Sequence, residues 1–284
     1  MGYCYTRDSA MLVLADGMGG HPQGEVAAQL ALQTIAGLFQ KLAQPKLLDV
    51  ASFLSDAVMA AHRQILQYAT SKGMLDSPRT TIVLAVVQAG NVSWTHCGDS
   101  RLYWVRDNAL LKRTRDHSFA EQTSISATDL KKLGRPNRNV LFTCLGSPIK
   151  PVFSVSSPMS LQQGDKLMLC SDGLWSSLSE DEIIFELSQN AVDCAVPDLV
   201  EKALRKAGDA SDNVTCMGLS WETPDAFEPS RGGVSTDTIS DGVFASTVQA
   251  AWLDATLDDL DDAAIERSIA EINEVIRRTS EKKT

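Results

Sequence analysis

The stretch from Leu12 to Ala28, LVLADGMGGHPQGEVAA, constrains the fold more than any other part of the chain. An unbroken apolar run over residues 10–15 predicts a strand that is buried on both faces. The run stops at Asp16-Gly17, and glycine-rich sequence follows until helical spacing begins near Gln23. The sequence therefore predicts a carboxylate at the end of a buried strand, in a turn where backbone can approach a ligand closely. Asp-Gly is also a common turn dipeptide, so the pair alone is equally consistent with an ordinary turn.

The length of 284 residues allows one large core, or one domain and a tail. No apolar run reaches the roughly 18 residues of a membrane span, and the N-terminus lacks the pattern of a signal peptide. The six cysteines show no CxxC spacing and several lie in apolar strands, which indicates buried thiols rather than disulfides or zinc ligands. These features predict a cytoplasmic protein without a membrane segment.

The acidic charge is concentrated late in the chain. Residues 222–264 contain ten acidic residues and one base, Arg231, whereas residues 1–221 are nearly neutral. No basic patch favours a nucleic-acid partner.

Apolar residues at spacings of three and four predict two helices within residues 23–73, interrupted at Pro45. A capping box of Ser179 and Glu182 begins a third helix, and a fourth is predicted over residues 196–207. Short strands, largely an antiparallel meander, are predicted over residues 79–87, 91–97, 102–105, 110–112, 151–155, 165–170 and 214–219. A more polar excursion over residues 116–147 contains a short predicted helix at 127–133.

Four aspartates, Asp16, Asp99, Asp172 and Asp212, each lie where a predicted strand meets a turn. Converging carboxylates repel one another unless cations neutralise them, and oxygen-only ligands favour Mg²⁺ or Mn²⁺. Two such ions suit phosphoester hydrolysis. Each aspartate on its own could instead be an ordinary turn residue. A two-metal nuclease has less support, because no basic side chains line up to hold a polynucleotide.

Five motifs in order carry a resemblance to a known family: DGMGGH at 16–21, GDSR at 98–101, RDHS at 115–118, SDG at 171–173 and SDN at 211–213. With them, residues 10–221 resemble the metal-dependent Ser/Thr protein phosphatases (PPM or type 2C), in the bacterial form. The resemblance implies an α+β fold, a four-layer α/β/β/α sandwich of two antiparallel sheets flanked by helices.

The implied activity is hydrolysis of phosphoserine and phosphothreonine monoesters by a metal-activated water at a two-metal centre. Phosphorylated proteins would be the substrates. The implied role is to reverse the signalling of a bacterial Ser/Thr kinase, with the enzyme acting as a monomer and that cognate kinase as a partner.

The resemblance also implies a role for each matching residue. Asp16 would bridge two Mn²⁺ or Mg²⁺ ions, and Gly17 would offer its carbonyl oxygen to one of them. Asp172 and Asp212 would ligate the first ion, and Asp99 with Asp172 would support a third, weaker site. Residues 117–147 match the family's flap, which borders the catalytic cleft. Animal members have a proposed general-acid histidine where this chain has Met18, so that role is unassigned here, with His21 as the alternative.

The start of the chain departs from the family pattern. Members carry an upstream strand with a phosphate-binding arginine and an acidic metal-site pair, and MGYCYTRDS looks like the segment that follows that strand. We therefore expect a chain that lacks its N-terminal strand, has an unpaired sheet edge and is weakly active. Arg7 and Asp8 are the alternative source of these groups, with Arg7 as a substrate-binding candidate. An inactive pseudophosphatase or binding module is the alternative function.

The expected domain organisation has three parts. Residues 1–221 form the phosphatase domain, 222–260 an acidic linker, and 261–284 a C-terminal amphipathic helix with an isoleucine stripe. That helix is either a docking element or a short solvated helix. Limited proteolysis is expected to cut within 222–260 and leave a folded core.

Overall fold

A computed structural model describes residues 1–119, 121, 140–208, 212–222 and 244–246. The chain divides into two compact units, Met1–Thr247 and Val248–Thr284. All described residues belong to the first unit. The predicted C-terminal helix lies outside the described residues, as does the short helix predicted at 127–133.

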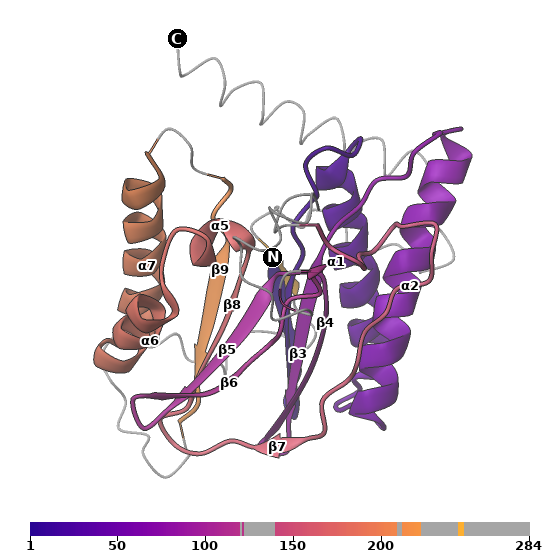
Figure 1. Ribbon diagram of the computed structural model, residues 1–284. Helices are drawn as coiled ribbons and strands as arrows, with labels where there is room; N and C mark the ends of the chain where they lie inside the picture. The colour runs from indigo at the N-terminus through magenta and orange to yellow at the C-terminus, as the bar shows by residue number, and fades with distance from the viewer. Residues whose placement is uncertain (120, 122–139, 209–211, 223–243, 247–284) are drawn as a thin grey trace. The chain divides into compact units, whose positions relative to one another are not determined.

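Two antiparallel sheets form the centre of the first unit (Figure 1). The larger has the order β10-β1-β2-β3-β4-β7, and the smaller has the order β6-β5-β8-β9. The strands of the larger sheet are β1 (Gly2–Tyr5), β2 (Ser9–Leu14), β3 (Ile82–Gln88), β4 (Asn91–Cys97), β7 (Met159–Ser160) and β10 (Phe244–Ser246). Those of the smaller sheet are β5 (Arg101–Arg106), β6 (Ala109–Arg113), β8 (Lys166–Cys170) and β9 (Cys216–Ser220).

Helices cover the outer face of each sheet. The larger sheet is covered by α1 (Gly24–Leu42) and α2 (Val50–Ser71), drawn in indigo and purple in Figure 1. The smaller sheet is covered by α6 (Glu180–Gln189) and α7 (Val192–Ala207), on the opposite side of the molecule. The four layers confirm the predicted α+β sandwich.

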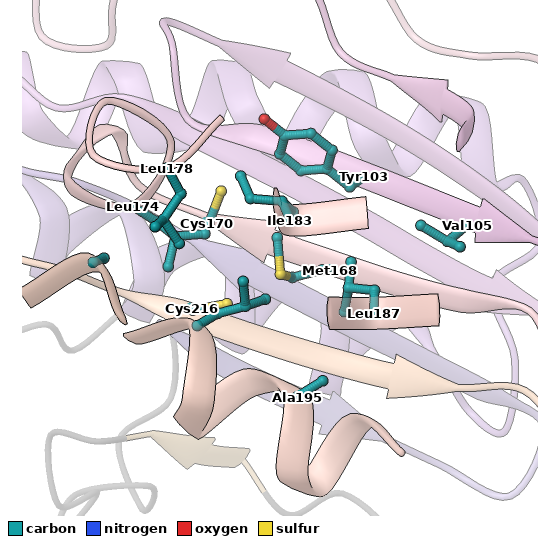
Figure 2. Close-up of a cluster of buried hydrophobic side chains, with 12 residues drawn as sticks. Tyr103, Val105, Met168, Cys170, Leu174, Leu178, Ile183, Leu187, Ala195 and Cys216 are labelled. Atoms are coloured by element: carbon teal, nitrogen blue, oxygen red, sulfur yellow. The ribbon is translucent and has the colours of Figure 1, made fainter. Parts of the chain in front are cut away.

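The apolar residues of the predicted strands and helices fill buried clusters between the sheets and beneath the helices. Leu14, Val83 and Leu169 belong to a cluster between the sheets. The alternate residues Met11, Val13 and Leu84 are also buried, on the face that α1 and α2 cover, so β2 and β3 have apolar residues on both faces. A second cluster lies between the smaller sheet and helices α6 and α7, and Figure 2 shows Met168, Ile183 and Leu187 within it. Burial of each such side chain contributes about 1.5–3 kcal/mol to folding.

The predicted capping box at the start of α6 is confirmed. The Glu182 backbone N–H donates to Ser179 Oγ at 3.3 Å, and the Ser179 N–H donates to Glu182 Oε2 at 2.7 Å. The predicted strand at 151–155 is wrong except for one isolated bridge between Val155 and Thr95. Two prolines, Pro151 and Pro158, remove backbone donors there and limit pairing. Among the described residues, no helix combines the length and apolar character needed to cross a membrane.

The two ends of this unit meet at the edge of the larger sheet, contrary to expectation. The N-terminal residues form β1, which pairs with β2 in the register Gly2↔Val13 to Tyr5↔Ala10. On its other side β1 pairs with β10, with Cys4 opposite Phe244. The expectation that Met1–Ser9 supplies no strand is therefore wrong. Three residues of the predicted linker also belong to the sheet; the rest of that segment stays a prediction.

Candidate metal centre

The loop that carries Asp16 is fixed by the segment that precedes β3. The Asp16 carbonyl oxygen accepts hydrogen bonds from Thr81 N–H at 2.9 Å and from Thr80 Oγ1 at 2.7 Å. Gly17 forms an isolated bridge with Thr80. A Cβ on Gly17 would lie 2.4 Å from the backbone of Gly24, so only glycine allows α1 to begin this close to the loop.

The turns that carry Asp172 and Asp212 follow and precede neighbouring strands, β8 and β9. Ser171 joins them: its N–H donates to Thr215 O at 2.9 Å, and its Oγ donates to Asn213 O at 3.1 Å. A Cβ on Gly173 would meet Asn213 O at 2.5 Å, which explains the glycine of the SDG motif. The pairing of β8 with β9 therefore brings two aspartates 40 positions apart in sequence to one end of the smaller sheet.

Asp99 lies in the connection between β4 and β5, which links the two sheets. Its side chain is buried, and its backbone oxygen accepts a hydrogen bond from Trp175 Nε1 at 2.9 Å. Trp175 ends α5 (Asp172–Trp175), so this contact ties Asp99 to the turn that carries Asp172.

The electrostatics show that the structure brings the four aspartates together. The pKa of Asp16 is raised to about 8. Burial is the largest cause, and the charges of Asp172, Asp212 and Asp99 add to it. Burial, then the charge of Asp172, raises the pKa of Asp99 to about 7. The pKa of Asp172 is raised by burial and by Asp212. The interaction with the Asp172 side chain also raises the pKa of Asp16, so these two carboxyl groups are neighbours in the cluster.

This donor set fits a divalent cation by its chemistry. A cation would offset the repulsion among the four carboxylates and would favour their ionised forms. All four side chains offer oxygen, the ligand type that Mg²⁺ and Mn²⁺ prefer. The side chains do not form a complete coordination shell. Within the described ranges, no group of three or more His, Cys, Asp or Glu residues is already arranged to hold a metal ion.

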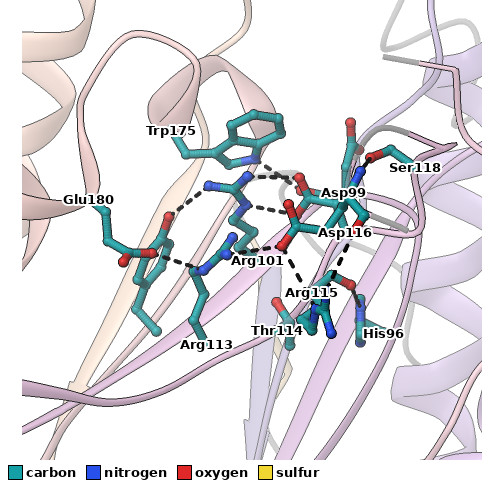
Figure 3. Close-up of polar contacts among 12 residues, drawn as sticks. His96, Asp99, Arg101, Arg113, Thr114, Arg115, Asp116, Ser118, Trp175 and Glu180 are labelled. Carbon is teal, nitrogen blue, oxygen red and sulfur yellow. Dashed lines mark hydrogen bonds and ion pairs between the residues drawn. The ribbon is translucent and has the colours of Figure 1, made fainter. Parts of the chain in front are cut away.

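An arginine of the GDSR motif, Arg101, lies near Asp99 (Figure 3). Arg101 donates from Nε and Nη2 to the two oxygens of Asp116, both at 2.7 Å, and its guanidinium lies 3.7 Å from the ring centroid of Trp175. Bidentate pairs of this kind fix both orientation and position. Arg101 therefore links the RDHS and GDSR motifs to the turn that carries Asp172.

Two stacked histidines lie beside this network. The rings of His96 and His117 are 4.3 Å apart, and burial lowers the pKa of His117 to about 4. They line a cavity of about 440 Å³ at the base of the predicted flap, together with Asp116 and Phe142. None of the four candidate ligands lines this cavity, so the described cavity and the acidic cluster are separate features.

Arg7 is not part of the cluster. It is exposed in the turn between β1 and β2, whereas Asp16 follows the other end of β2. At about 3.3 Å per residue an extended strand places the two roughly 25–30 Å apart. His21 lies closer, in the loop after Asp16, but its Nδ1 is engaged by Asp76 Oδ2 at 2.8 Å. Met18 carries no titratable proton, so the general acid stays unassigned.

Local sequence patterns did not indicate the residues around this loop that come from elsewhere in the chain. Asp76 and Arg79 border it, and Asp116 holds Arg101. The only sequence signal was the presence of an arginine immediately before a strand and an aspartate within the RDHS motif.

Comparisons with known proteins agree with this geometry. The family model described as Protein phosphatase 2C matches residues 1–207. The chain belongs to this family. The serine/threonine protein phosphatase PstP of Mycobacterium tuberculosis is 35% identical over 212 residues, which cover 73% of this chain and 39% of PstP. The serine/threonine phosphatase stp of Listeria welshimeri is 32% identical over 178 residues, which cover 61% of this chain and 69% of that protein.

A solved structure shows the same fold. The catalytic domain of PstP in complex with two manganese ions superposes with a TM-score of 0.59 and 32% identity, covering 72% of this chain and 85% of that domain. The chain thus matches about two fifths of the length of full PstP, in the part of that relative that corresponds to a catalytic domain.

Proposed function

We propose that this chain is a metal-dependent protein serine/threonine phosphatase that uses Mn²⁺ or Mg²⁺. The observation that carries the proposal is the cluster of four aspartates, in which the pKa of Asp16 reaches about 8 and that of Asp99 about 7. Carboxyl groups held this close retain protons near neutral pH unless cations take their place. The relatives named as Ser/Thr phosphatases, and the two manganese ions bound by the PstP domain, support the same assignment.

The residues of the chain have distinct parts in the proposal. Asp16, with the Gly17 carbonyl oxygen, would hold both cations; Asp172 and Asp212 would hold one of them, and Asp99 a third, weaker one. The bound cations supply Lewis acidity toward water and the phosphoryl oxygens of the substrate. Asp16, whose pKa is raised to about 8, would have to be ionised to hold them, and Thr80 and Thr81 keep the Asp16 backbone in place.

The biological setting belongs to the same proposal. The substrates would be phosphoproteins of a cognate Ser/Thr kinase, and the enzyme would act as a cytoplasmic monomer. Size-exclusion chromatography with light scattering measures the oligomeric state directly. Phosphoproteome comparison of cells with and without the protein identifies the substrates.

The decisive experiment measures turnover of p-nitrophenyl phosphate and of a phosphothreonine peptide by the full chain, with Mn²⁺ and with EDTA. We expect activity only with Mn²⁺, and a loss of at least about 100-fold in Asp172→Asn, because one ligand and one charge are removed. Asp56→Asn, at an exposed position on α2, is the matched control. No turnover by the wild-type chain with Mn²⁺ would favour the pseudophosphatase alternative.

A further inference from the structure

The segment before β3 runs alongside the loop that carries Asp16. Met18 N–H donates to the Arg79 carbonyl oxygen at 2.9 Å, and the following residue, Thr80, bridges Gly17. Arg79 is therefore adjacent to the acidic cluster in space, although 63 positions separate it from Asp16 in sequence.

The side chain of Arg79 is only partly engaged. Its Nη2 donates to Asp76 Oδ1 at 3.2 Å, and its Nε is buried and makes no hydrogen bond to any residue in the described part of the chain. Asp76 in turn holds His21 Nδ1 at 2.8 Å. A guanidinium has five donors, and a buried donor without a partner is unfavourable. About a quarter of the side chain, 24%, remains exposed.

Two other arginines show what an arginine with a structural role looks like in this protein. Arg101 and Arg106 each bind one carboxylate through Nε and Nη2, with all four distances at 2.7 Å. Their partners, Asp116 and Asp165, are both buried. Arg79 has instead one longer contact, through Nη2, to an aspartate that is 47% exposed. Its Nε is buried, so any donors that it offers to another anion are on the Nη groups of the partly exposed side chain.

We propose that Arg79 is a substrate-binding residue that engages the phosphoryl group of a phosphomonoester at the rim of the acidic cluster. Asp76 holds the guanidinium near the loop, and His21 holds Asp76. A phosphomonoester dianion meets four carboxylates at this site, and a cationic side chain at the rim offsets part of that repulsion even with cations bound. Arg101 does not fill this role, because its Nε and Nη2 donors are both bound to Asp116. The inference rests on the proposed function.

The test compares Arg79→Gln and Arg79→Lys with wild type, using Mn²⁺-loaded full chain and a phosphothreonine peptide. We expect Arg79→Gln to raise KM about tenfold or more while kcat changes less than about threefold, because a binding interaction is lost. Arg79→Lys should recover part of the loss, because lysine restores the positive charge but lacks the paired guanidinium donors. Arg63→Ala, an exposed arginine on α2, should match wild type in both constants.

A second measurement separates this inference from the function itself. Isothermal titration with Mn²⁺ and then with inorganic phosphate should show unchanged Mn²⁺ affinity in Arg79→Gln and about tenfold weaker phosphate binding, equivalent to about 1.4 kcal/mol. Unchanged KM and phosphate affinity would overturn the role of Arg79, and so would a loss of Mn²⁺ affinity, because Arg79 would then act through the loop. If wild type has no turnover, the proposed function fails. The phosphate titration then still decides whether Arg79 binds a phosphoryl group.

Discussion

The substitution Asp172→Asn should stabilise the protein in EDTA while it abolishes stabilisation by Mn²⁺. The pKa of Asp16 is about 8 in the folded chain against an ordinary value near 4, so the folded state keeps a proton that the unfolded state loses in this window. The free energy of unfolding therefore falls as the pH rises from about 4 to 8. The full difference corresponds to about 5 kcal/mol, and solvent screening of a half-buried carboxyl reduces it to about 2–3 kcal/mol.

Burial is the largest cause of this shift and Asp172 is the second, so removal of the Asp172 charge should restore about 1 kcal/mol at pH 7.5. For a domain of about 200 residues this raises Tm by about 2–4 °C. Scanning calorimetry in EDTA and at increasing Mn²⁺ measures both effects. Wild type at a Mn²⁺ concentration of about 100 Kd should gain about 2.7 kcal/mol, and Asp172→Asn should gain almost none.

The control Asp56→Asn should reproduce wild type in both conditions, because that side chain is exposed on α2. A lower Tm for Asp172→Asn in EDTA would refute the reasoning, since it would mean that Asp172 supports the fold instead of opposing the ionisation of Asp16. An undiminished Mn²⁺ response would remove Asp172 from the metal centre.

Three further outcomes are expected. Asp99→Asn should leave the two core ions bound, seen by anomalous diffraction, yet slow turnover, and loss of the core pair would contradict its peripheral placement. Mn²⁺ affinity should rise by about ten- to a hundredfold from pH 6 to pH 8, because Asp16 and Asp99, with pKa values of about 8 and 7, must lose their protons when the ion binds. Calorimetry in two buffers should detect this proton release. A binding enthalpy that does not depend on the buffer would contradict the prediction. Asp165→Ala should cost about 3 kcal/mol of stability in urea unfolding, because it leaves Arg106 and the Gln162 N–H unpaired, with Mn²⁺ affinity unchanged.

The sequence was sufficient to place the four aspartates next to strand ends, because each follows or precedes an apolar strand and is marked by Gly, Ser or Asn; their part as metal ligands stays a prediction. The layers could also be predicted, since apolar spacing separates α1 and α2 from the meander. Arg7 was misjudged because nearness in sequence is not nearness in space along an extended strand. Arg79 was missed because its contact with Met18 joins positions 61 residues apart, and local patterns carry no information on such pairings.

Strand β1 was missed for a related reason. It has four residues, too few for alternation to be distinguished from chance, and its partner β10 lies within a stretch whose composition indicates a linker. Pairing of three residues from such a stretch depends on the acceptor edge that β1 offers.

The pairing of β1 with β10 also determines when the protein can complete its fold. Residues 2–4 pair with residues 244–246, so the last partner of β1 is synthesised more than 200 residues after β1 itself. At about 5–20 residues per second, this interval lasts roughly 12–50 s. The β2-β3-β4 meander and the helices on its outer face can assemble during that time, whereas the outer edge of β1 stays unpaired. A nascent chain therefore presents an open strand edge for most of its synthesis, and an open edge of this kind can pair with another chain.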